Sequence, residues 1–241
     1  MRAKTDLTLK HAALGDIVVP AGQVLALVGP SGGGKSTLLR CMTGLEVFEA
    51  GTVRVADASL VAGPKAKNEK AYEALHFCSG LVFQQWHLFP HMSAIENVME
   101  APVHVKKVPI EVARAKAKSL LAEVGLSHRE DAMPRSMSGG EQQRCAIARA
   151  LAMQPKVLFM DEPTSALDPQ RVGDLVELLE HLTKEQKLTL VVVTHEMAFA
   201  QKLADRAIVL YEGHIIEDGP PSDVLASPKD ARTRTFLGMD D

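Results

Sequence analysis

The amino-acid sequence predicts an α/β fold in which helices cover both faces of a mostly parallel sheet. Three short apolar runs at residues 24–28, 156–160 and 188–193 carry this prediction. Strands that are apolar on both faces are typical of the centre of a parallel sheet, whereas strands with one solvated face alternate. Each run ends in glycine or polar residues, which is where ligand-binding residues of open α/β sheets lie.

Two further segments alternate more strongly and are predicted as edge or antiparallel strands. They are residues 51–55 and residues 207–216, the latter with a turn at 212–213. Residues 36–43 show helical spacing directly after a glycine-rich turn, so the first apolar run begins a strand–loop–helix unit.

Strand signals almost disappear in the middle of the chain. Residues 110–124 and 141–153 carry apolar side chains at helical intervals, with charged residues on the other face. The chain is therefore predicted as one domain, residues 1–241. A catalytic α/β core is expected from residues 1–85 and 156–241, interrupted by a helical subdomain at residues 86–155.

Composition and charge exclude several classes of protein. Of the 241 residues, 46% are hydrophobic and 24% are charged, as in ordinary globular chains, and the net charge of −3 provides no basic field for nucleic acid. No window approaches the roughly 18 apolar residues of a membrane span, and the N-terminus lacks the apolar run of a signal peptide. Contact with a membrane is therefore expected through another chain.

Residues 29–37 read GPSGGGKST and match the phosphate-binding pattern G-x-x-x-x-G-K-[ST]. Glycines let consecutive backbone N–H groups point at phosphate oxygens, and the following helix adds its positive end. Lys35 is expected to reach the β- and γ-phosphates, and the Ser36 hydroxyl to face Mg²⁺. The candidate nucleotide ligands are Gly29, Pro30, Ser31, Gly32, Gly33, Gly34, Lys35, Ser36 and Thr37.

Polar residues at the ends of two other predicted strands supply candidate catalytic groups. Asp161 ends the run VLFMD, so a parallel strand beside the first would bring its carboxylate to the phosphate loop and the metal. The adjacent Glu162 can orient and deprotonate an attacking water. His195 follows the run VVVT, where a histidine can hydrogen-bond the γ-phosphate.

Six motifs in order resemble those of the nucleotide-binding subunit of ATP-binding cassette (ABC) transporters. GPSGGGKST is similar to that family's Walker A motif, and VLFMDE to its Walker B motif. Gln84, in GLVFQQWHLFP, resembles the Q-loop glutamine, and Asp168, in SALD, resembles the D-loop aspartate. His195 resembles the switch histidine, and MSGGEQQR the family signature. The resemblance extends from about Leu14 to the C-terminus.

The resemblance implies a P-loop NTPase fold and an ATPase that uses ATP and Mg²⁺. The fold would be a RecA-like, mostly parallel sheet with an antiparallel β edge and the inserted helical subdomain. Glu162, His195 and Gln84 would be catalytic, and Ser36, Gln84 and Asp161 would hold the metal.

The resemblance also implies a head-to-tail homodimer in which each ATP lies between the Walker A loop of one copy and the signature loop of the other. Ser138, Gly139, Gly140 and Glu141 would act on the partner's ATP. The positive end of the helix that they begin suits an incoming phosphate, and Ser138 could also be its N-cap.

Several fragments, among them RCAIARALAM and VVVTHEMAFA, are most similar to importers of polar amino acids. This implies membrane permease partners, an extracytoplasmic solute-binding protein, and a peripheral location at the cytoplasmic face of the inner (plasma) membrane. No residue names the solute. One alternative is a cassette for lipoprotein release or efflux, which commonly carries GGE in its signature. A remote alternative is an ABC ATPase of DNA repair, whose long coiled-coil or zinc insertions are missing from this sequence.

The sequence departs from the family pattern at three places. Met137 replaces the usual leucine of the signature, a volume-conserving change. Glu141 replaces the importers' glutamine, and its charge favours the helix dipole while opposing a nearby phosphate. No aromatic residue precedes Phe48, although the family stacks adenine on one. Either His11 or an aliphatic side chain replaces it, or recognition of the base is loose.

Overall fold

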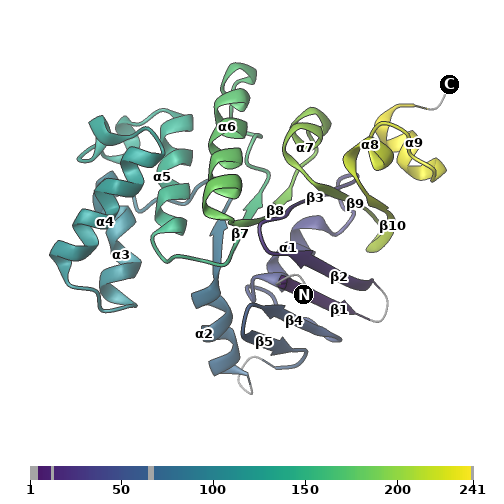
Figure 1. Cartoon of the computed structure of the whole chain (residues 1–241), viewed down its shortest axis with the longest axis horizontal. Coiled ribbons are helices and arrows are strands. Elements are labelled where there is room, and N and C mark those ends of the chain that lie inside the picture. Colours follow the sequence, from purple (N-terminus) through teal and green to yellow (C-terminus); the bar gives the residue numbers. More distant parts are fainter. Residues whose placement is uncertain (1–4, 12–13, 65–67, 240–241) are drawn as a thin grey trace.

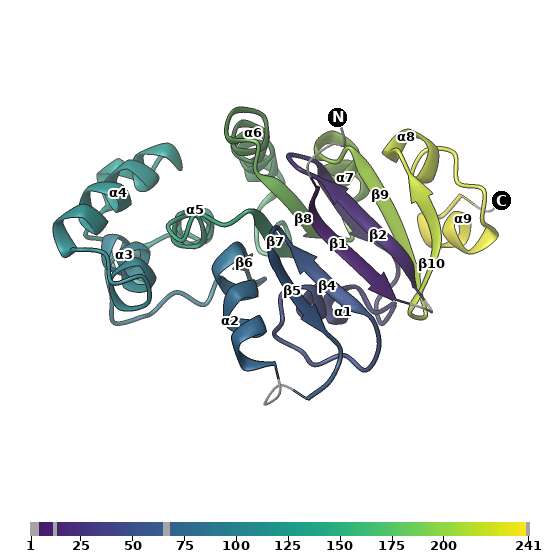
Figure 2. The ribbon, with the colours of Figure 1, turned by 60° about the horizontal axis from the view of Figure 1, so that its bottom comes forward.

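The computed structural model describes residues 5–11, 14–64 and 68–239, and its central element is a six-stranded sheet (Figures 1 and 2). The strand order is β10-β9-β3-β8-β7-β6, and all strands are parallel except β10. The strands are β3 (Val24–Val28), β6 (Ser79–Val82), β7 (Val157–Asp161), β8 (Thr189–Val193), β9 (Arg206–Tyr211) and β10 (His214–Gly219). Every residue of β3, β7 and β8 is buried, which confirms the prediction made from the three apolar runs.

A second, fully antiparallel sheet covers one face of the first. Its strand order is β2-β1-β4-β5. The strands are β1 (Thr5–His11), β2 (Gly15–Pro20), β4 (Thr52–Val55) and β5 (Ala58–Val61). Helices α1 (Lys35–Met42) and α2 (Glu69–Cys78) contribute to the apolar core between the two sheets. The first of these helices was predicted at residues 36–43.

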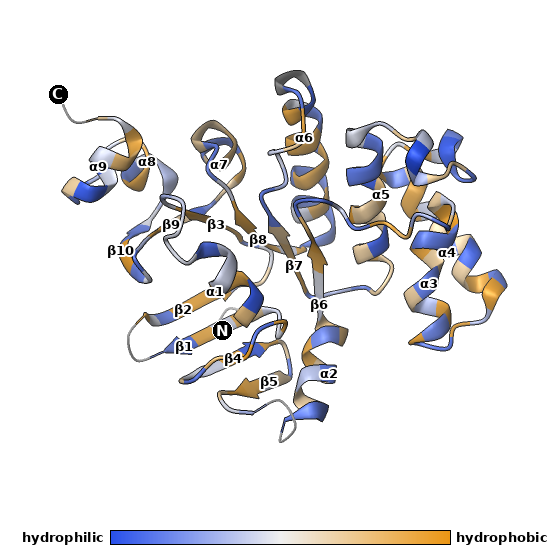
Figure 3. Ribbon diagram, turned by 180° about the vertical axis from the view of Figure 1, so that it is seen from behind, coloured by the Kyte–Doolittle hydropathy of each residue, from blue (hydrophilic) through white to orange (hydrophobic). Residues whose placement is uncertain are grey.

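Helices α6 (Pro169–Gln186) and α7 (Met197–Leu203) lie on the opposite face of the large sheet (Figure 1). The short α8 (Pro221–Val224) packs on β9, and α9 (Ala231–Leu237) follows near the C-terminus. The large sheet therefore has apolar cover on both sides, and Figure 3 shows the interior strands β3, β7 and β8 as strongly hydrophobic. This double cover is the physical reason for the continuous apolar runs.

The helices α3 (Ala94–His104), α4 (Ile110–Glu123) and α5 (Gly139–Leu151) form a group at one end of the molecule (Figure 1). Two 3-10 turns, Ser127–Arg129 and Pro134–Ser136, connect α4 to α5. The three helices pack on one another, and their apolar core is continuous with the face of the large sheet that carries α6. The helices predicted at residues 110–124 and 141–153 correspond to α4 and α5.

The strands predicted at residues 207–216 are antiparallel to each other, as β9 and β10, but only β10 lies at an edge of the sheet. The turn lies where expected, because Glu212 (φ 47°) and Gly213 (φ 77°) both adopt the positive φ of a two-residue hairpin turn. However, β9 is an interior strand that runs parallel to β3. Ile208 and Leu210 face the core between the sheets, whereas Ala207 and Val209 face α7 and α8. Both faces of β9 are therefore buried.

Candidate functional site

The loop between β3 and α1 is held in shape by the neighbouring strand β9. A Cβ atom at Gly29 would lie 2.1 Å from the carbonyl oxygen of Leu210, and Gly29 has a φ of 139°. Gly34, the N-cap of α1, has a φ of 96°. Both positions thus require glycine, the first for close approach and both for backbone conformation. The chain then enters α1 with its first N–H groups directed toward the loop, as a phosphate site requires.

Lys35 is the first residue of α1, and only 7% of its surface is exposed. Its ammonium donates hydrogen bonds to the carbonyl oxygens of Gly29 and Pro30, each at 2.8 Å. Burial lowers the pKa of Lys35, while the negative charges of Glu162 and Asp161 oppose that shift. The loop therefore holds a buried positive charge through two neutral carbonyl groups, and an anionic oxygen would be a stronger partner for this charge.

Asp161 and Ser36 are in contact as the sequence predicted, although β7 is not the neighbour of β3, because β8 lies between them. Asp161 is the last residue of β7, and its Oδ1 accepts a 2.9 Å hydrogen bond from the Ser36 hydroxyl. The carboxylate is almost fully buried, with 9% of the residue exposed. One carboxylate and one hydroxyl thus lie together beside the loop of Lys35.

The two other predicted catalytic residues lie beside the carboxylate of Glu162. Gln84 Nε2 donates to Oε2 at 3.2 Å, and His195 Nδ1 lies 3.5 Å from Oε1. These three side chains follow β6, β7 and β8, which are adjacent parallel strands and end at one edge of the sheet. Glu162 has a φ of 47°, unusual for a residue with a side chain, and its N–H donates to the carbonyl of Val193 at 2.9 Å. The chain turns at this residue, directly after the strand.

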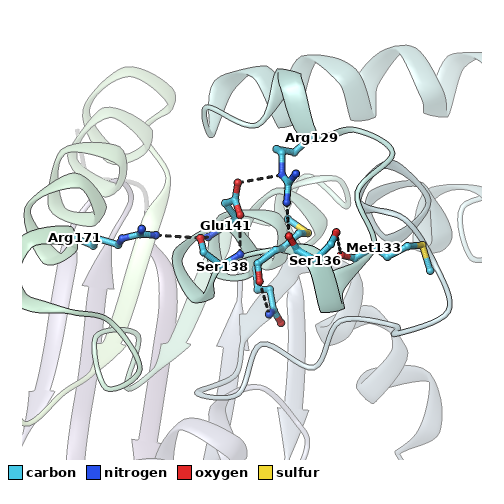
Figure 4. Close-up of polar contacts among 8 residues, drawn as sticks. Arg129, Met133, Ser136, Ser138, Glu141 and Arg171 are labelled. Atoms are coloured by element: carbon cyan, nitrogen blue, oxygen red, sulfur yellow. Dashed lines mark hydrogen bonds and ion pairs between the residues drawn. The ribbon is translucent and has the colours of Figure 1, made fainter.

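Ser138 is the N-cap of α5, and Glu141 completes a capping box with it (Figure 4). The Ser138 hydroxyl oxygen accepts the N–H of Glu141 at 3.3 Å, and Glu141 Oε2 accepts the N–H of Ser138 at 2.7 Å. Glu141 Oε1 forms an ion pair with Arg129 Nε at 3.1 Å. The hydrogen bond from the Ser138 backbone, together with the smaller effect of Arg129, lowers the pKa of Glu141.

The loop of Ser138 does not join the cluster around Lys35. Among residues 5–11, 14–64 and 68–239, no hydrogen bond connects Ser138, Gly139 or Gly140 with Lys35, Asp161 or Glu162. Asp168, the predicted D-loop residue, instead caps α6 and forms an ion pair with Arg171 at 3.1 Å, and Arg171 donates to the Ser138 hydroxyl. The predicted residues therefore form two separate groups within one chain.

Three side chains that connect α5 or its first loop to other loops of the site were not predicted from the sequence. Arg171 links the loops of Asp168 and Ser138. Gln143, buried in α5, donates through Nε2 to the carbonyl of Pro163, the residue after Glu162. Arg149 donates to the carbonyl oxygens of Trp86 and His87, which come directly after Gln85 in the chain. Arginine and glutamine are ordinary on a helix surface, so the sequence carried no signal that separated these side chains from solvated ones.

An apolar cavity of about 230 Å³ opens beside the phosphate loop. It extends from Gly34 and Thr37 to His11 and Phe48. The lining residues are Leu9, His11, Leu14, Gly34, Thr37, Leu38, Cys41, Phe48, Ala50, Leu210 and Gly213. His11 and several aliphatic side chains, the alternatives predicted for the base, thus lie around one space.

Comparisons with known proteins agree with this geometry. Residues 16–165 match a family model described as ABC transporter. The chain is 48% identical to the arginine transport ATP-binding protein ArgV of Corynebacterium glutamicum and to the L-cystine transport system ATP-binding protein TcyN of Escherichia coli. In each case 92% of this chain and 89% of the relative are covered. It is 47% identical to the L-cystine import ATP-binding protein TcyC of Bacillus subtilis, with the same coverage.

Two solved structures are similar as well. CbiO1 from Clostridium perfringens, part of an ABC transporter complex, has a TM-score of 0.82 and 30% identity, covering 93% of this chain and 92% of its own. A dimeric ATP-binding cassette in a post-hydrolysis state with ADP and Pi bound has a TM-score of 0.76 and 29% identity. That match covers 89% of this chain and 98% of the other.

Proposed function

Because the chain belongs to the ABC transporter family and is one of its ATPases, we propose that it powers the import of a polar amino acid through a membrane permease. The observation that carries this proposal is the high identity to ATP-binding proteins of arginine, cystine and glutamine transport over nearly the whole chain. The word import in the name of TcyC favours this direction over lipoprotein release or efflux. The names of the relatives specify the transport of different amino acids, so we propose the class of the solute and not its identity.

Hydrolysis is proposed to occur at the cluster around Glu162. A carboxylate at the strand end can take a proton from a water molecule that attacks the γ-phosphate. Gln84 and His195 both lie at hydrogen-bonding or near hydrogen-bonding distance from that carboxylate, so they can orient it and the water. His195 is half exposed and can also contact the phosphate.

The loop at residues 29–37 is proposed to bind the nucleotide phosphates. Lys35 would exchange its two carbonyl partners for phosphate oxygens, a change that favours binding because charge-assisted hydrogen bonds are stronger than neutral ones. Ser31 and Thr37 are exposed at the two ends of the loop, where a nucleotide can reach them.

Ser36 and Asp161 fit the coordination that Mg²⁺ requires, with Gln84 as a further ligand. Mg²⁺ is usually held by one or two carboxylates, several waters and substrate phosphates, and not by a dedicated protein cage. One carboxylate beside one hydroxyl agrees with this, and no group of three or more histidine, cysteine or acidic side chains in the described part of the chain could hold a metal. When bound, Mg²⁺ would neutralise charge that develops on the phosphates.

A second copy of the chain is proposed to complete the site. The loop of Ser138, Gly139, Gly140 and Glu141 begins α5 and lies apart from Lys35 within one chain, and a related cassette is dimeric with ADP and Pi bound. The positive end of α5 suits a γ-phosphate presented by a partner. Arg129 offsets the charge of Glu141, so that the capping carboxylate opposes the phosphate less than an unpaired one would.

Residues 86–155 are proposed to form the subdomain that transmits movement to the permease. Trp86 and His87 follow Gln84, and Arg149 ties both to α5. None of the helices in the described part of the chain is long and apolar enough to cross a bilayer. We propose, because the relatives are ATP-binding proteins of transport systems, that the chain binds at the cytoplasmic face of the membrane through permease subunits, in a system that includes a solute-binding protein and no nucleic acid.

Replacement of the proposed base tests this function. Glu162→Gln keeps the size and the hydrogen bond to Gln84 but cannot accept the proton, and turnover of ATP is expected to fall by roughly 10²–10⁴-fold while ATP still binds. Steady-state release of phosphate and the binding of a fluorescent ATP analogue measure the two properties. The matched control is Glu185→Gln, an exposed residue at the far end of α6, which should retain normal turnover. Near-normal hydrolysis by Glu162→Gln would overturn the assignment.

A further inference from the structure

Arg171, in the first turn of α6, reaches the N-cap of α5 (Figure 4). Its Nη1 donates a 3.0 Å hydrogen bond to the Ser138 hydroxyl oxygen. Its Nε forms an ion pair with Asp168 Oδ2 at 3.1 Å, and Asp168 Oδ1 accepts the backbone N–H of Arg171 at 3.1 Å. One carboxylate thus both caps α6 and aims the guanidinium of Arg171 at Ser138.

The glycines after Ser138 leave room for this contact. A Cβ atom at Gly140 would lie 3.1 Å from Arg171 Nη1 and 3.4 Å from its Cδ, closer than such atoms normally approach. A Cβ atom at Gly139 would lie 3.0 Å from the ring of Trp86. The first turn of α5 therefore lies close between Arg171 and Trp86, and a side chain at either glycine would require these neighbours to move by a few tenths of an ångström.

The hydrogen bonds to Ser138 determine where its proton can go. A serine hydroxyl has two acceptor lone pairs and one O–H donor. Arg171 Nη1 and the N–H of Glu141 both donate to this oxygen, at 3.0 and 3.3 Å. Because both lone pairs are engaged, the hydroxyl is left to act as a donor, which is what a phosphate oxygen requires.

The capping box of α3 shows what the same motif does without an arginine. There Ser93 accepts the N–H of Glu96 and donates its proton to Glu96 Oε2 at 2.9 Å, so the proton stays within the box. At α5, Arg171 contacts the serine and Arg129 forms an ion pair with the carboxylate of Glu141. Arg129 weakens the competition of Glu141 for the Ser138 proton, because it pairs with the same carboxylate. The Ser138 hydroxyl still contributes to the lowered pKa of Glu141, but less than the Ser138 backbone N–H does.

We propose that Arg171 is a positioning residue that ties Asp168 to Ser138 and turns the Ser138 hydroxyl outward as a donor to the γ-phosphate held by a second copy of the chain. This inference rests on the proposed function, in which Ser138 acts on the partner's ATP. Only a planar fork can hold a carboxylate and a hydroxyl at fixed positions together, and lysine is a single point charge. The contact also gives a direct connection between the loops of Asp168 and Ser138.

The test measures the ATP concentration that produces half of the maximal dimer in a Glu162→Gln background, in which ATP is retained. Addition of Arg171→Gln is expected to raise this concentration by about tenfold, as for the loss of one charge-assisted hydrogen bond. Arg171→Lys should not rescue it. The binding of ATP by the monomer should be unchanged, because residues 29–37 remain intact. Thermal unfolding should shift little, since exposed ion pairs contribute little to stability.

A double-mutant cycle separates positioning from direct contact with the phosphate. If Arg171 acts through Ser138, Arg171→Gln should cause no further loss in a Ser138→Ala chain. Additive losses, full rescue by Arg171→Lys, or normal dimer formation by Arg171→Gln would each overturn the inference while leaving the proposed function in place. A Glu162→Gln chain that binds ATP and stays monomeric would overturn the proposed function as well. If Arg171→Gln fails to fold, Asp168→Asn replaces it in the test. Asparagine still caps α6 but removes the ion pair with Arg171, so the ATP concentration for half-maximal dimer should rise as well.

Discussion

Glu141 shows how one side chain reconciles two opposing demands. Its carboxylate caps α5 by accepting the N–H of Ser138, and its charge is paired with Arg129. From the sequence, the charge of Glu141 was expected to favour the helix dipole and to repel a nearby phosphate, and the two effects could not be ranked. The residue that pairs with this charge, Arg129, lies twelve positions away on a 3-10 turn, so the sequence did not indicate the pairing. The structure shows that the carboxylate is engaged on both oxygens and is therefore no unpaired charge.

Replacement of Glu141 by glutamine should cost less than about 1 kcal/mol of stability at pH 7, because an amide can still accept the N–H of Ser138 while the ion pair is lost. Folding lowers the pKa of Glu141, so its contribution is present above the unfolded pKa of about 4.3 and is lost as the pH falls through the folded value. The difference between wild type and Glu141→Gln should therefore shrink as the pH falls below about 4.3. Urea unfolding across this range measures it.

Glu111→Gln is the matched control for that series, since Glu111 lies in the first turn of α4, whose N-cap makes no side-chain hydrogen bond. A Glu141→Gln difference that is independent of pH, or a stabilisation at pH 7, would contradict the assignment of Glu141 as an ionised cap.

At the scale of single elements, α3 and α5 begin with capping boxes of the same build but are expected to serve different purposes. Ser93 is buried and Ser138 is exposed. Loss of an N-cap costs typically about 1 kcal/mol, so Ser93→Ala and Ser138→Ala should both lower the free energy of unfolding. Only Ser138→Ala should weaken ATP-dependent dimer formation. Denaturant titration and size-exclusion chromatography with ATP compare the two variants. Equal effects on dimer formation would refute the assignment of different purposes to the two capping boxes.

Some elements could be predicted from the sequence, and the reason is visible in their burial. The strands β3, β7 and β8 are buried on both faces, and so their sequences are continuously apolar. The alternation of β4 was recognised, since residues 51–55 were predicted as a strand, whereas the alternation in β2 and β5 covers only four to six positions and gave a weak signal. The strand β9 is buried along most of its length as well, but residues 207–216 were interpreted as alternating and therefore as edge or antiparallel strands.

For the site, the sequence predicted residues that carry a recognisable pattern and not those that act through tertiary contacts. Lys35, Ser36 and Asp161 were predicted together because the phosphate loop and the strand end impose their spacing, and the Ser36–Asp161 contact agrees with that prediction. Arg171 was missed because its partner Ser138 lies 33 positions away, and neither residue alone indicates the contact.

In the whole molecule, no hydrogen bond links the two groups of candidate residues within the described part of the chain. Lys35 begins α1, and Asp161 and Glu162 lie at the end of β7. Ser138, in contrast, is the N-cap of α5 and contacts Arg171 of α6. A second copy resolves this division if each copy supplies one group. We therefore propose that ATP joins two copies of this chain.

The molar mass of Glu162→Gln by light scattering tests that claim most directly. With ATP and Mg²⁺ the mass should be twice the 26.0 kDa of one chain, whereas with ADP it should return to that of the monomer. A chain that demonstrably binds ATP yet keeps the mass of a monomer, at concentrations well above those at which a related dimer forms, would contradict the account.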